Sequence, residues 1–407
     1  MKRMDNGAFD AVNRGATCTR RTLFAAMAAA ATSCLFAPAL ALAEDASGAV
    51  AFSLSDDGAT RLYYSHEAAV QAACAGNVVF LNADWQLAET LSVAEGQTLT
   101  IDMNGHKIAG DGSATVIHLG KSCSLTLQCS ETGGLLTGGN SASGAGGIQM
   151  DDGSTLVLDN VVVADNCGKL GGGVGVDQDC TVYLRDGASI RNNSGRFGGG
   201  VYSHASGTTI HLEDHSAISE NYATEGGGGI FFYDSKFSVC SDDGTGCISG
   251  NKTGGVGGAV DTYSVVSASN SAEFSGITFS ENHADGSCGA IELRQSGVTF
   301  RDCDFLDNSA GTDAGAVRLG LECDTSMEGC TVSGNYCSDA GVGGGIVCNE
   351  GAEVALSGAY VIDGNTRGKY GTPDDLQINE PQVGIFFCDR NGRNTAFEDD
   401  EPWQLAS

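Results

Sequence analysis

The sequence predicts an all-β fold, a parallel β-solenoid of about ten coils with three short strands in each coil. Three observations predict it: a repeat of 26 to 31 residues between about Gly139 and Asn365, glycine-rich corners, and apolar residues that alternate with polar ones. Alternation with a period of two is typical of strands, and the 3.6-residue period of a helix is absent from the repeats. Each copy of the repeat is therefore interpreted as one coil.

Each copy opens with glycines before a β-branched residue and closes with an apolar residue three positions before an asparagine, as in Gly257 to Val260 and Phe279 to Asn282. The opening positions are Ile148, Val174, Val201, Ile230, Val260, Ile291, Val317 and Ile346. The closing asparagines are Asn166, Asn193, Asn221, Asn251, Asn282, Asn308, Asn335 and Asn365, and a fainter copy ends at Asn140. Asparagine tolerates a left-handed corner and stacked amides can hydrogen-bond, so we expect these side chains to bond from coil to coil.

A third apolar segment lies between the opening and the closing of each copy. Its apolar residues are two positions apart, as in Val182 and Leu184 or Ile210 and Leu212. Opening, middle and closing segments account for the three strands expected in each coil.

The pairing of Gly-Gly-Ala-Val with Phe-x-x-Asn resembles the repeat of chlamydial polymorphic outer-membrane proteins. More widely, it is similar to the right-handed parallel β-helix superfamily, also called pectin-lyase-like. The full form occurs at Gly257 to Val260, Phe279 to Asn282 and Phe305 to Asn308, and the motif spans about half of the chain. The resemblance implies a single-stranded right-handed coil with three faces. It fixes no activity, because lyases, hydrolases, adhesins and phage tailspikes share this fold.

Residues 1–43 are expected to be an export signal peptide. Thr19 to Phe24 resembles a twin-arginine motif, an apolar run follows, and Ala41 to Ala43 is a small-residue cleavage site. We therefore expect an exported protein, secreted or held at the cell surface, without a membrane span in the mature chain. Ala31 to Cys34 offers an alternative, a lipid anchor through Cys34.

The remaining boundaries follow from changes of pattern. Residues 44–76 are expected to form a linker and a short capping helix with Ser65 as N-cap and Gly76 as its stop. Such a helix would cover the open end of the coil. Residues 77–395 are expected to form the β-helix and residues 396–407 an acidic tail. Within the last coils, Thr366 to Glu380 is interpreted as a polar insertion and Val383 to Cys388 as one more opening strand.

Composition limits the classes of partner. The chain has 60 glycines, only 4 prolines and a formal net charge of −30. The negative charge argues against nucleic acid and anionic membranes as partners, because their phosphate groups bind positively charged protein surfaces. A solvated surface explains the charge, with cation binding as the alternative. We expect a monomer.

Neither a cofactor nor a metal site is predicted. Gly172 to Asp177 matches the start of a calcium-binding nonapeptide repeat, but it occurs as a single copy at an ordinary corner of the coil. The segment is therefore interpreted either as a calcium site or as a turn without a ligand. The cysteines do not show the sequence spacing that is typical of zinc ligands. Cys303 and Cys330 both lie five residues before their asparagines, and equivalent positions in adjacent coils are within disulfide reach, so we predict that bridge.

The outward side chains of the opening strands form the candidate functional surface. The residues expected to bind a ligand there are Tyr202, His204, Phe231, Tyr233, Tyr263, Arg294 and Arg318. Aromatic rings could stack on sugar rings, and arginines could hold hydroxyls or uronate carboxylates. In related lyases and hydrolases the corresponding face carries the active site, which the resemblance alone implies here.

Asp261 and Glu292 are the candidate catalytic pair. As equivalent residues of adjacent coils they would lie about 5 Å apart, near the separation that a retaining glycosidase uses. The alternative is a surface ladder in which Glu292 pairs with Arg318 of the next coil.

Three functions fit these observations. The one we favour is a rod-like β-helix protein that binds an extracellular glycan or a component of a host or cell surface, as an adhesin does, without catalysis. The second is a polysaccharide lyase or glycoside hydrolase that acts on the outward face of the opening strands. The third is a structural spacer.

Overall fold

The computed structural model describes residues 52–56, 59–63, 69–71, 77–131, 133–233, 236–263, 272–294, 297–321, 323–349, 351–378, 385–388 and 394–396. The chain divides into two units, Met1–Asp45 and Ala46–Ser407, and all described residues belong to the second. The predicted export signal and the acidic tail from 397 onward lie outside the described residues. No helix among the described residues is long and apolar enough to span a bilayer.

The described strands form four sheets that run along the coils, which we name opening, second, third and fourth in the order in which one coil visits them. The opening sheet contains β5 (Leu91–Val93), β8 (Ile117–Leu119), β12 (Ile148–Met150), β16 (Val174–Val176), β20 (Val201–Ser203), β24 (Ile230–Tyr233), β28 (Val260–Tyr263), β32 (Ile291–Arg294), β36 (Val317–Leu319), β40 (Ile346–Cys348) and β45 (Leu376–Ile378). The second sheet contains β2 (Ala59–Tyr63), β1 (Phe52–Asp56), β3 (Val78–Leu81), β6 (Thr98–Asp102), β9 (Ser124–Gln128), β13 (Thr155–Asp159), β17 (Thr181–Arg185), β21 (Thr208–Leu212), β25 (Phe237–Cys240), β29 (Ala272–Ser275), β33 (Val298–Arg301), β37 (Asp324–Glu328), β41 (Glu353–Ser357), β46 (Ile385–Cys388) and β47 (Asn394–Ala396).

The other two sheets consist of shorter strands. The third sheet contains β4 (Trp85–Gln86), β7 (Lys107–Ala109), β10 (Gly134–Thr137), β14 (Val161–Ala164), β18 (Ser189–Arg191), β22 (Ala217–Ser219), β26 (Cys247–Ser249), β30 (Thr278–Ser280), β34 (Asp304–Leu306), β38 (Thr331–Ser333) and β42 (Val361–Asp363). The fourth sheet contains β11 (Asn140–Ser141), β15 (Cys167–Leu170), β19 (Ser194–Phe197), β23 (Tyr222–Gly226), β27 (Lys252–Thr253), β31 (His283–Ala284), β35 (Ser309–Ala310), β39 (Tyr336–Cys337), β43 (Thr366–Arg367) and β44 (Thr372–Pro373).

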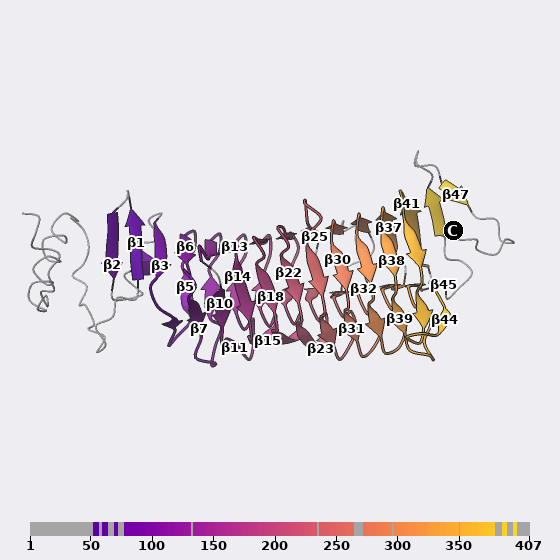
Figure 1. The fold of residues 1–407 in the computed structure, drawn as a ribbon, viewed down its shortest axis with the longest axis horizontal. Coiled ribbons are helices and arrows are strands. Elements are labelled where there is room, and N and C mark those ends of the chain that lie inside the picture. Colours follow the sequence, from indigo (N-terminus) through magenta and orange to yellow (C-terminus); the bar gives the residue numbers. More distant parts are fainter. Residues whose placement is uncertain are drawn as a thin grey trace, which may run out of the picture. The chain divides into compact units, whose positions relative to one another are not determined.

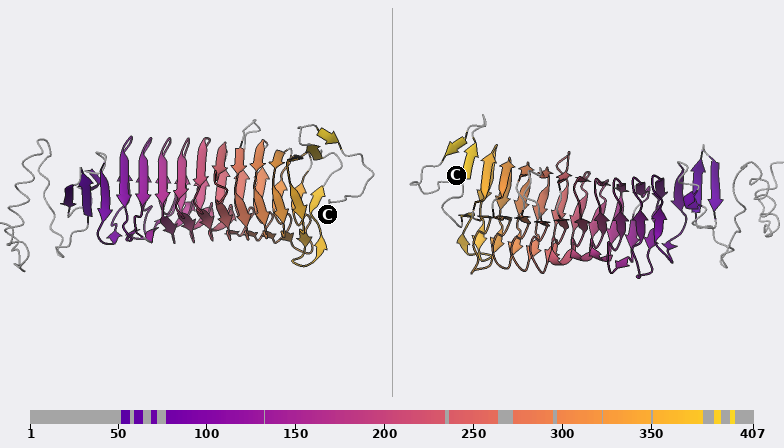
Figure 2. Two further views of the ribbon diagram at one scale, coloured as in Figure 1. Left: turned by 45° about the horizontal axis from the view of Figure 1, so that its top comes forward. Right: turned by 180° about the vertical axis from the view of Figure 1, so that it is seen from behind.

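This arrangement confirms the predicted parallel β-solenoid of the right-handed type with about ten coils (Figures 1 and 2). The predicted register is confirmed as well, because the opening residues pair from Ile148 through to Ile346 without a slip. The coil nevertheless has four strands rather than the three expected. The additional fourth strand is only two to five residues long and rich in glycine and polar residues, so it lacks the apolar alternation that marks a strand in a sequence.

A ladder of buried asparagines joins the coils at the corner between the third and fourth sheets. Asn251 shows the pattern: its backbone N–H and its side-chain Nδ2 both donate to Oδ1 of Asn282, each at 3.0 Å. Nδ2 also donates to the carbonyl oxygen of Ile218 at 2.9 Å, and Oδ1 accepts the corresponding pair from Asn221. The same bonds link each asparagine from Asn166 to Asn365 to the next. The predicted ladder is thus confirmed.

Two details of the ladder differ from the prediction. The left-handed corner is made by the residue before each asparagine, as at Asp165 with φ 57° and Gly250 with φ 62°, because the asparagine itself must turn its amide inward. The earlier copy is also displaced by one residue. Asn140 pairs with Cys167, so Gly139 stands at the ladder position and its N–H donates to Oδ1 of Asn166.

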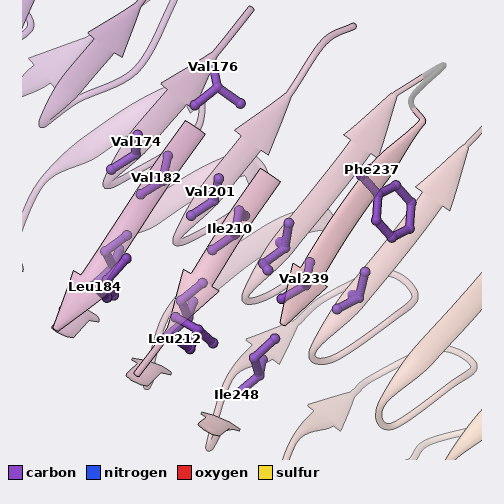
Figure 3. Close-up of a cluster of buried hydrophobic side chains, with 14 of the residues drawn as sticks. Val174, Val176, Val182, Leu184, Val201, Ile210, Leu212, Phe237, Val239 and Ile248 are labelled. Carbon is purple, nitrogen blue, oxygen red and sulfur yellow. The ribbon is translucent and has the colours of Figure 1, made fainter. Parts of the chain in front are cut away.

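The core is continuous through the coils because inward side chains of the opening, second and third sheets meet in the middle. Figure 3 shows this packing for successive coils, with Val174 and Val182 followed by Val201 and Ile210. Like residues stack on one another farther along. The rings of Phe274 and Phe300 lie 5.2 Å apart, and an equivalent phenylalanine pair in the third sheet lies at 4.9 Å. Repeating one residue type at one position therefore lets like side chains pack from coil to coil in the interior.

Antiparallel strands occur at both ends of the second sheet. β1 and β2 form a hairpin on β3, within residues that the sequence analysis assigned to a linker. Residues 69–71 of the predicted capping helix are helical and Ala69 is buried in the core, while the rest of that helix lies outside the described residues.

The interpretation of the C-terminal region was wrong in two places. The last opening strand is β45, inside the predicted polar insertion, and it pairs with β40. β46 pairs with β41 in the second sheet rather than serving as an opening strand, and β47 runs antiparallel to it. Asp374 stands two positions before β45, where each copy from Ile148 to Ile346 has a glycine, so this strand lacks the opening motif of the other copies.

The predicted Cys303–Cys330 disulfide is not formed in the structure, in which both residues are free thiols. Their neighbours Asp304 and Thr331 pair directly, so the two cysteines do hold equivalent positions in adjacent coils. Both are buried, and burial raises the pKa of Cys303 to about 12 and that of Cys330 to about 11. These thiols fill space in the core and are poor nucleophiles.

We predict that Asn251→Ala lowers the free energy of unfolding by at least about 3 kcal/mol, because it leaves buried donors of Asn221 and the carbonyl of Ile218 without partners. Asp375→Asn is the matched control. Asp375 accepts the last ladder bonds, from the N–H and Nδ2 of Asn365 at 2.8 and 2.9 Å, and an amide oxygen can replace its carboxylate oxygen. Urea unfolding followed by circular dichroism measures both, and equal losses would contradict the role of the ladder.

We also predict that Cys303 and Cys330 resist an aromatic disulfide reagent at pH 8 in the folded protein and react in urea, whereas the exposed Cys167 reacts at once. Peptide mapping without reduction completes the measurement. A peptide that links 303 to 330 would show that these two residues form a bridge in the isolated protein.

Candidate functional site

The outward side chains of the opening sheet form two parallel rows, which differ in exposure. The covered row consists of Gln149, Gly175, Tyr202, Phe231, Asp261, Glu292, Arg318 and Val347. The open row, two positions later in the chain, consists of Asp151, Asp177, His204, Tyr233, Tyr263, Arg294, Gly320 and Asn349.

Strands of the fourth sheet pack over the covered row. The ring of Phe197 lies 4.8 Å from that of Phe231, and a Cβ atom on Gly226 would stand only 2.4 Å from Oδ2 of Asp261. Tyr202 is consequently only 8% exposed and Phe231 5%, although both were predicted to contact a ligand. Their rings are part of the packing between two sheets, and alternation along a strand cannot reveal that a neighbouring sheet covers its outer face.

Four side chains of the open row form an exposed column, which we call the aromatic column: His204, Tyr233, Tyr263 and Arg294. The imidazole of His204 stacks on Tyr233 at 5.7 Å, Tyr233 stacks on Tyr263 at 5.5 Å, and the guanidinium of Arg294 lies 5.4 Å from the centre of the Tyr263 ring. The interplanar angles of 7° and 17° mean that the ring faces contact one another. A sugar ring can therefore stack only at an end of the column, while the middle offers ring edges and phenol hydroxyls.

The covered row contains a charged cluster beside this column. Nη2 of Arg294 lies 3.2 Å from Oδ2 of Asp261, and its Nε lies 3.7 Å from Oε1 of Glu292. Arg318 approaches Glu292 from the next coil at 3.4 Å. Cys288, at the preceding corner, donates its thiol hydrogen to Oε2 of Glu292 at 2.8 Å. Sequence reasoning found the four charged residues but missed Cys288, which lies four residues before Glu292 at the position that Gly257 holds in the preceding copy.

Asp261 is the unusual member of the charged cluster. It is 2% exposed, and its Oδ1 has no hydrogen-bond partner. Burial raises the pKa of Asp261 to about 8, with a further rise from the charge of Glu292 and an opposing effect of Arg294. The protonated form of Asp261 is thus favoured relative to that of an exposed aspartate, because one arginine does not replace the water that the carboxylate has lost.

The pairing predicted for the catalytic residues is present, since Asp261 and Glu292 are direct partners in adjacent strands. The alternative interpretation is present at the same time, because Glu292 forms an ion pair with Arg318. Two carboxyl groups on adjacent strands, one of them with a raised pKa, are the kind of pair that glycoside hydrolysis uses. Both carboxyl groups, however, lie beneath the fourth sheet and behind arginines, where a sugar chain has no room to approach.

Metal ligands do not converge in the described part of the chain: no group of three or more His, Cys, Asp or Glu side chains there could hold an ion. Asp177, at the corner that resembles a calcium repeat, is close enough to Asp151, His118 and His204 for their charges to act on it. Burial raises the pKa of Asp177, and nearby carboxylates raise it further. His118 bonds to Asp151 at 3.0 Å, so this end of the open row holds a small acid–imidazole group.

We predict that Asp261→Asn makes the protein more stable at pH 8 and flattens the dependence of stability on pH. Between about pH 4 and pH 8 the folded state keeps a proton that unfolded Asp261 has lost, so the stability of the unmodified protein falls as pH rises. The slope due to this group is at most about 1.4 kcal/mol per pH unit.

Urea unfolding at pH 5, 6.5 and 8 provides the measurement for Asp261→Asn. The exposed Asp285→Asn serves as the control and should parallel the unmodified protein. Parallel curves for all three proteins would show that Asp261 is ionised throughout.

Comparison with known proteins finds no matching family model, no similar curated protein and no similar solved structure. The proposals below therefore depend on the geometry of this chain alone.

Proposed function

We propose that this protein is an exported binding protein that holds an extracellular glycan along the outer face of its opening sheet and does not cleave it. The aromatic column is the observation that carries the proposal. It sets two phenols, an imidazole and a guanidinium on the surface in consecutive coils, with Tyr263 38% exposed. A column of this kind adds nothing to the core, and a soluble chain would otherwise cover its face with small polar residues.

The spacing of the column suits an extended polymer. Parallel strands repeat about every 4.8 Å, and one sugar residue of an extended chain is about as long, so successive sugars meet successive coils. Phenol hydroxyls and the guanidinium donate hydrogen bonds to sugar hydroxyls, and ring edges pack against their C–H groups. Because the column is already stacked, its side chains lose little conformational entropy when a ligand binds.

Polysaccharide cleavage is the second candidate, favoured by the protonated Asp261 beside Glu292. Asp261 and Glu292 are buried and form ion pairs with arginines, which favours binding over cleavage. The pair then serves to fix Arg294 against Tyr263. Extracellular location remains part of the proposal and rests on the twin-arginine-like motif and the cleavage site.

We predict that Tyr233→Ala and Tyr263→Ala each weaken binding of the purified protein to oligosaccharides on a glycan array by about tenfold, because each breaks the stack and removes a hydroxyl. Tyr183→Ala is the matched control. Tyr183 stacks on His211 at 4.4 Å on the second sheet, so its loss removes an equivalent pair from another face. Equal effects of all three substitutions, or an array without any signal, would refute binding at the column.

We predict further that Asp261→Asn and Glu292→Gln leave sugar release from a panel of polysaccharides at the level of the unmodified protein. Reducing ends and unsaturated uronates are the products to assay. Product formation that either substitution abolishes would instead establish the catalytic alternative.

A further inference from the structure

Three side chains on the outer face of the fourth sheet form a chain of hydrogen bonds. Nδ1 of His283, on β31, lies 2.8 Å from Oγ of Ser309, on β35 of the next coil. Nε2 of the same imidazole lies 3.3 Å from Oδ1 of Asp285. A hydroxyl, an imidazole and a carboxylate in this order are the parts of a triad for acyl transfer, which is recognised by geometry and not by order in the sequence.

These contacts fix the tautomer of His283. An uncharged imidazole has one N–H, and a carboxylate can only accept. Nε2 therefore carries the hydrogen and donates it to Asp285, which leaves the lone pair of Nδ1 to accept the hydroxyl hydrogen of Ser309. The imidazole is thus placed to take a proton from the serine, which is the task of the general base when a serine attacks an ester.

The backbone holds the three residues at fixed positions beside the asparagine ladder. The N–H of His283 donates to the carbonyl oxygen of Asn251, and the N–H of Ser309 donates to the carbonyl oxygen of Asn282, each at 2.9 Å. The N–H of Asp285 is bonded in the same way to the preceding coil, also at 2.9 Å. Because paired strands carry the triad, it needs little rearrangement before it can react.

The serine is sheltered, whereas the other two groups reach solvent. Ser309 is 8% exposed and stands between His283 and Tyr336, its direct partners in the strands on either side. The side chains of His283 and Asp285 are 38% and 70% exposed. A substrate can therefore approach over the imidazole.

Tyr336, on β39, places a hydrogen-bond donor on the other side of the serine. The ammonium of Lys369 lies 5.9 Å from the centre of its ring. A tyrosine hydroxyl is a donor that can stabilise the oxyanion formed when a serine attacks an ester. The next residues of the same row, Lys252 before His283 and Thr366 after Tyr336, are polar. This surface suits a short acyl group, such as acetyl, better than a long apolar one.

We propose that Ser309, His283 and Asp285 form an esterase site that removes short acyl groups from esters of an alcohol. Oγ of Ser309 bonds to the carbonyl carbon while His283 takes the hydroxyl proton. The C–O bond to the alcohol then breaks, and His283 gives the proton to the departing oxygen. Water attacks the acyl-serine by the same route and releases a carboxylic acid. Asp285 is a positioning residue, which orients the imidazole. This activity lies on another face than the proposed glycan site and does not depend on it.

A fluorophosphonate probe tests the nucleophile, because it reacts with serines that a neighbouring base activates. Peptide mapping of the full-length protein should place the label on Ser309, and Ser309→Ala should abolish labelling. His283→Gln should slow it by about a hundredfold or more. Ser194→Ala is the matched control, since Ser194 lies in the same row but has Cys167 and Tyr222 as strand partners. Absence of a label, or a label on another residue, overturns the inference.

Hydrolysis of p-nitrophenyl acetate supplies the second measurement, after circular dichroism has shown that each variant keeps its fold. Ser309→Ala should reduce the rate to that of the buffer, and Tyr336→Phe should lower kcat by about a hundredfold. Asp285→Asn should lower kcat without a change in KM, and Asp285→Glu should recover much of the loss. A rate that Ser309→Ala leaves unchanged would assign hydrolysis to other surface groups and overturn the esterase site. Glycan binding at the aromatic column should persist in all of these variants.

Discussion

The asparagine ladder is the constraint on which the rest of the structure depends. Each asparagine side chain accepts bonds from a backbone N–H and a side-chain N–H₂ of the preceding asparagine, and it donates to a carbonyl oxygen. All of these groups would otherwise be buried without partners at the corner between the third and fourth sheets. Every asparagine hydrogen-bonds to the asparagine of the next coil, which fixes the register of the strands. The number of residues between two successive asparagines can therefore vary without shifting that register. Insertions are thus absorbed by the turns, and both rows of the opening sheet stay aligned across coils of unequal length.

Alignment of this kind explains how isolated surface residues become a site. Tyr233, Tyr263 and Arg294 are about thirty residues apart, and each would be an ordinary exposed side chain in another fold. Because the ladder aligns the coils, these residues lie on adjacent strands and are separated by one strand spacing each. Stacking then holds the rings in one orientation. The same alignment brings Asp261 beside Glu292, so the buried charges and the exposed column are two consequences of one register.

The sequence was sufficient to predict the coil, its register and the composition of both rows, because all three depend on apolar periodicity and on one conspicuous asparagine. It was insufficient wherever a property depends on packing between sheets. Tyr202 and Asp261 occupy outward positions of their strands, and only the path of the fourth sheet shows that they are buried. The strand β45 was missed for a different reason, since Asp374 stands where the other copies have an opening glycine. Cys288 holds a corner position that is glycine in the preceding copy, and the repeat pattern did not show that its thiol contacts Glu292.

The direction of the ladder has a consequence for how such a chain can change in length. Every asparagine amide donates to Oδ1 of its C-terminal neighbour and to a carbonyl oxygen of the preceding coil, so a duplicated coil inserted anywhere between Asn166 and Asn365 would find partners on both sides. Asp375 ends that series, because its carboxylate accepts from Asn365 and carries no N–H to pass on. Evolution can therefore lengthen or shorten this protein by whole coils in its interior, and each such event outside the four coils of the aromatic column would move the column relative to the ends while leaving the column itself intact.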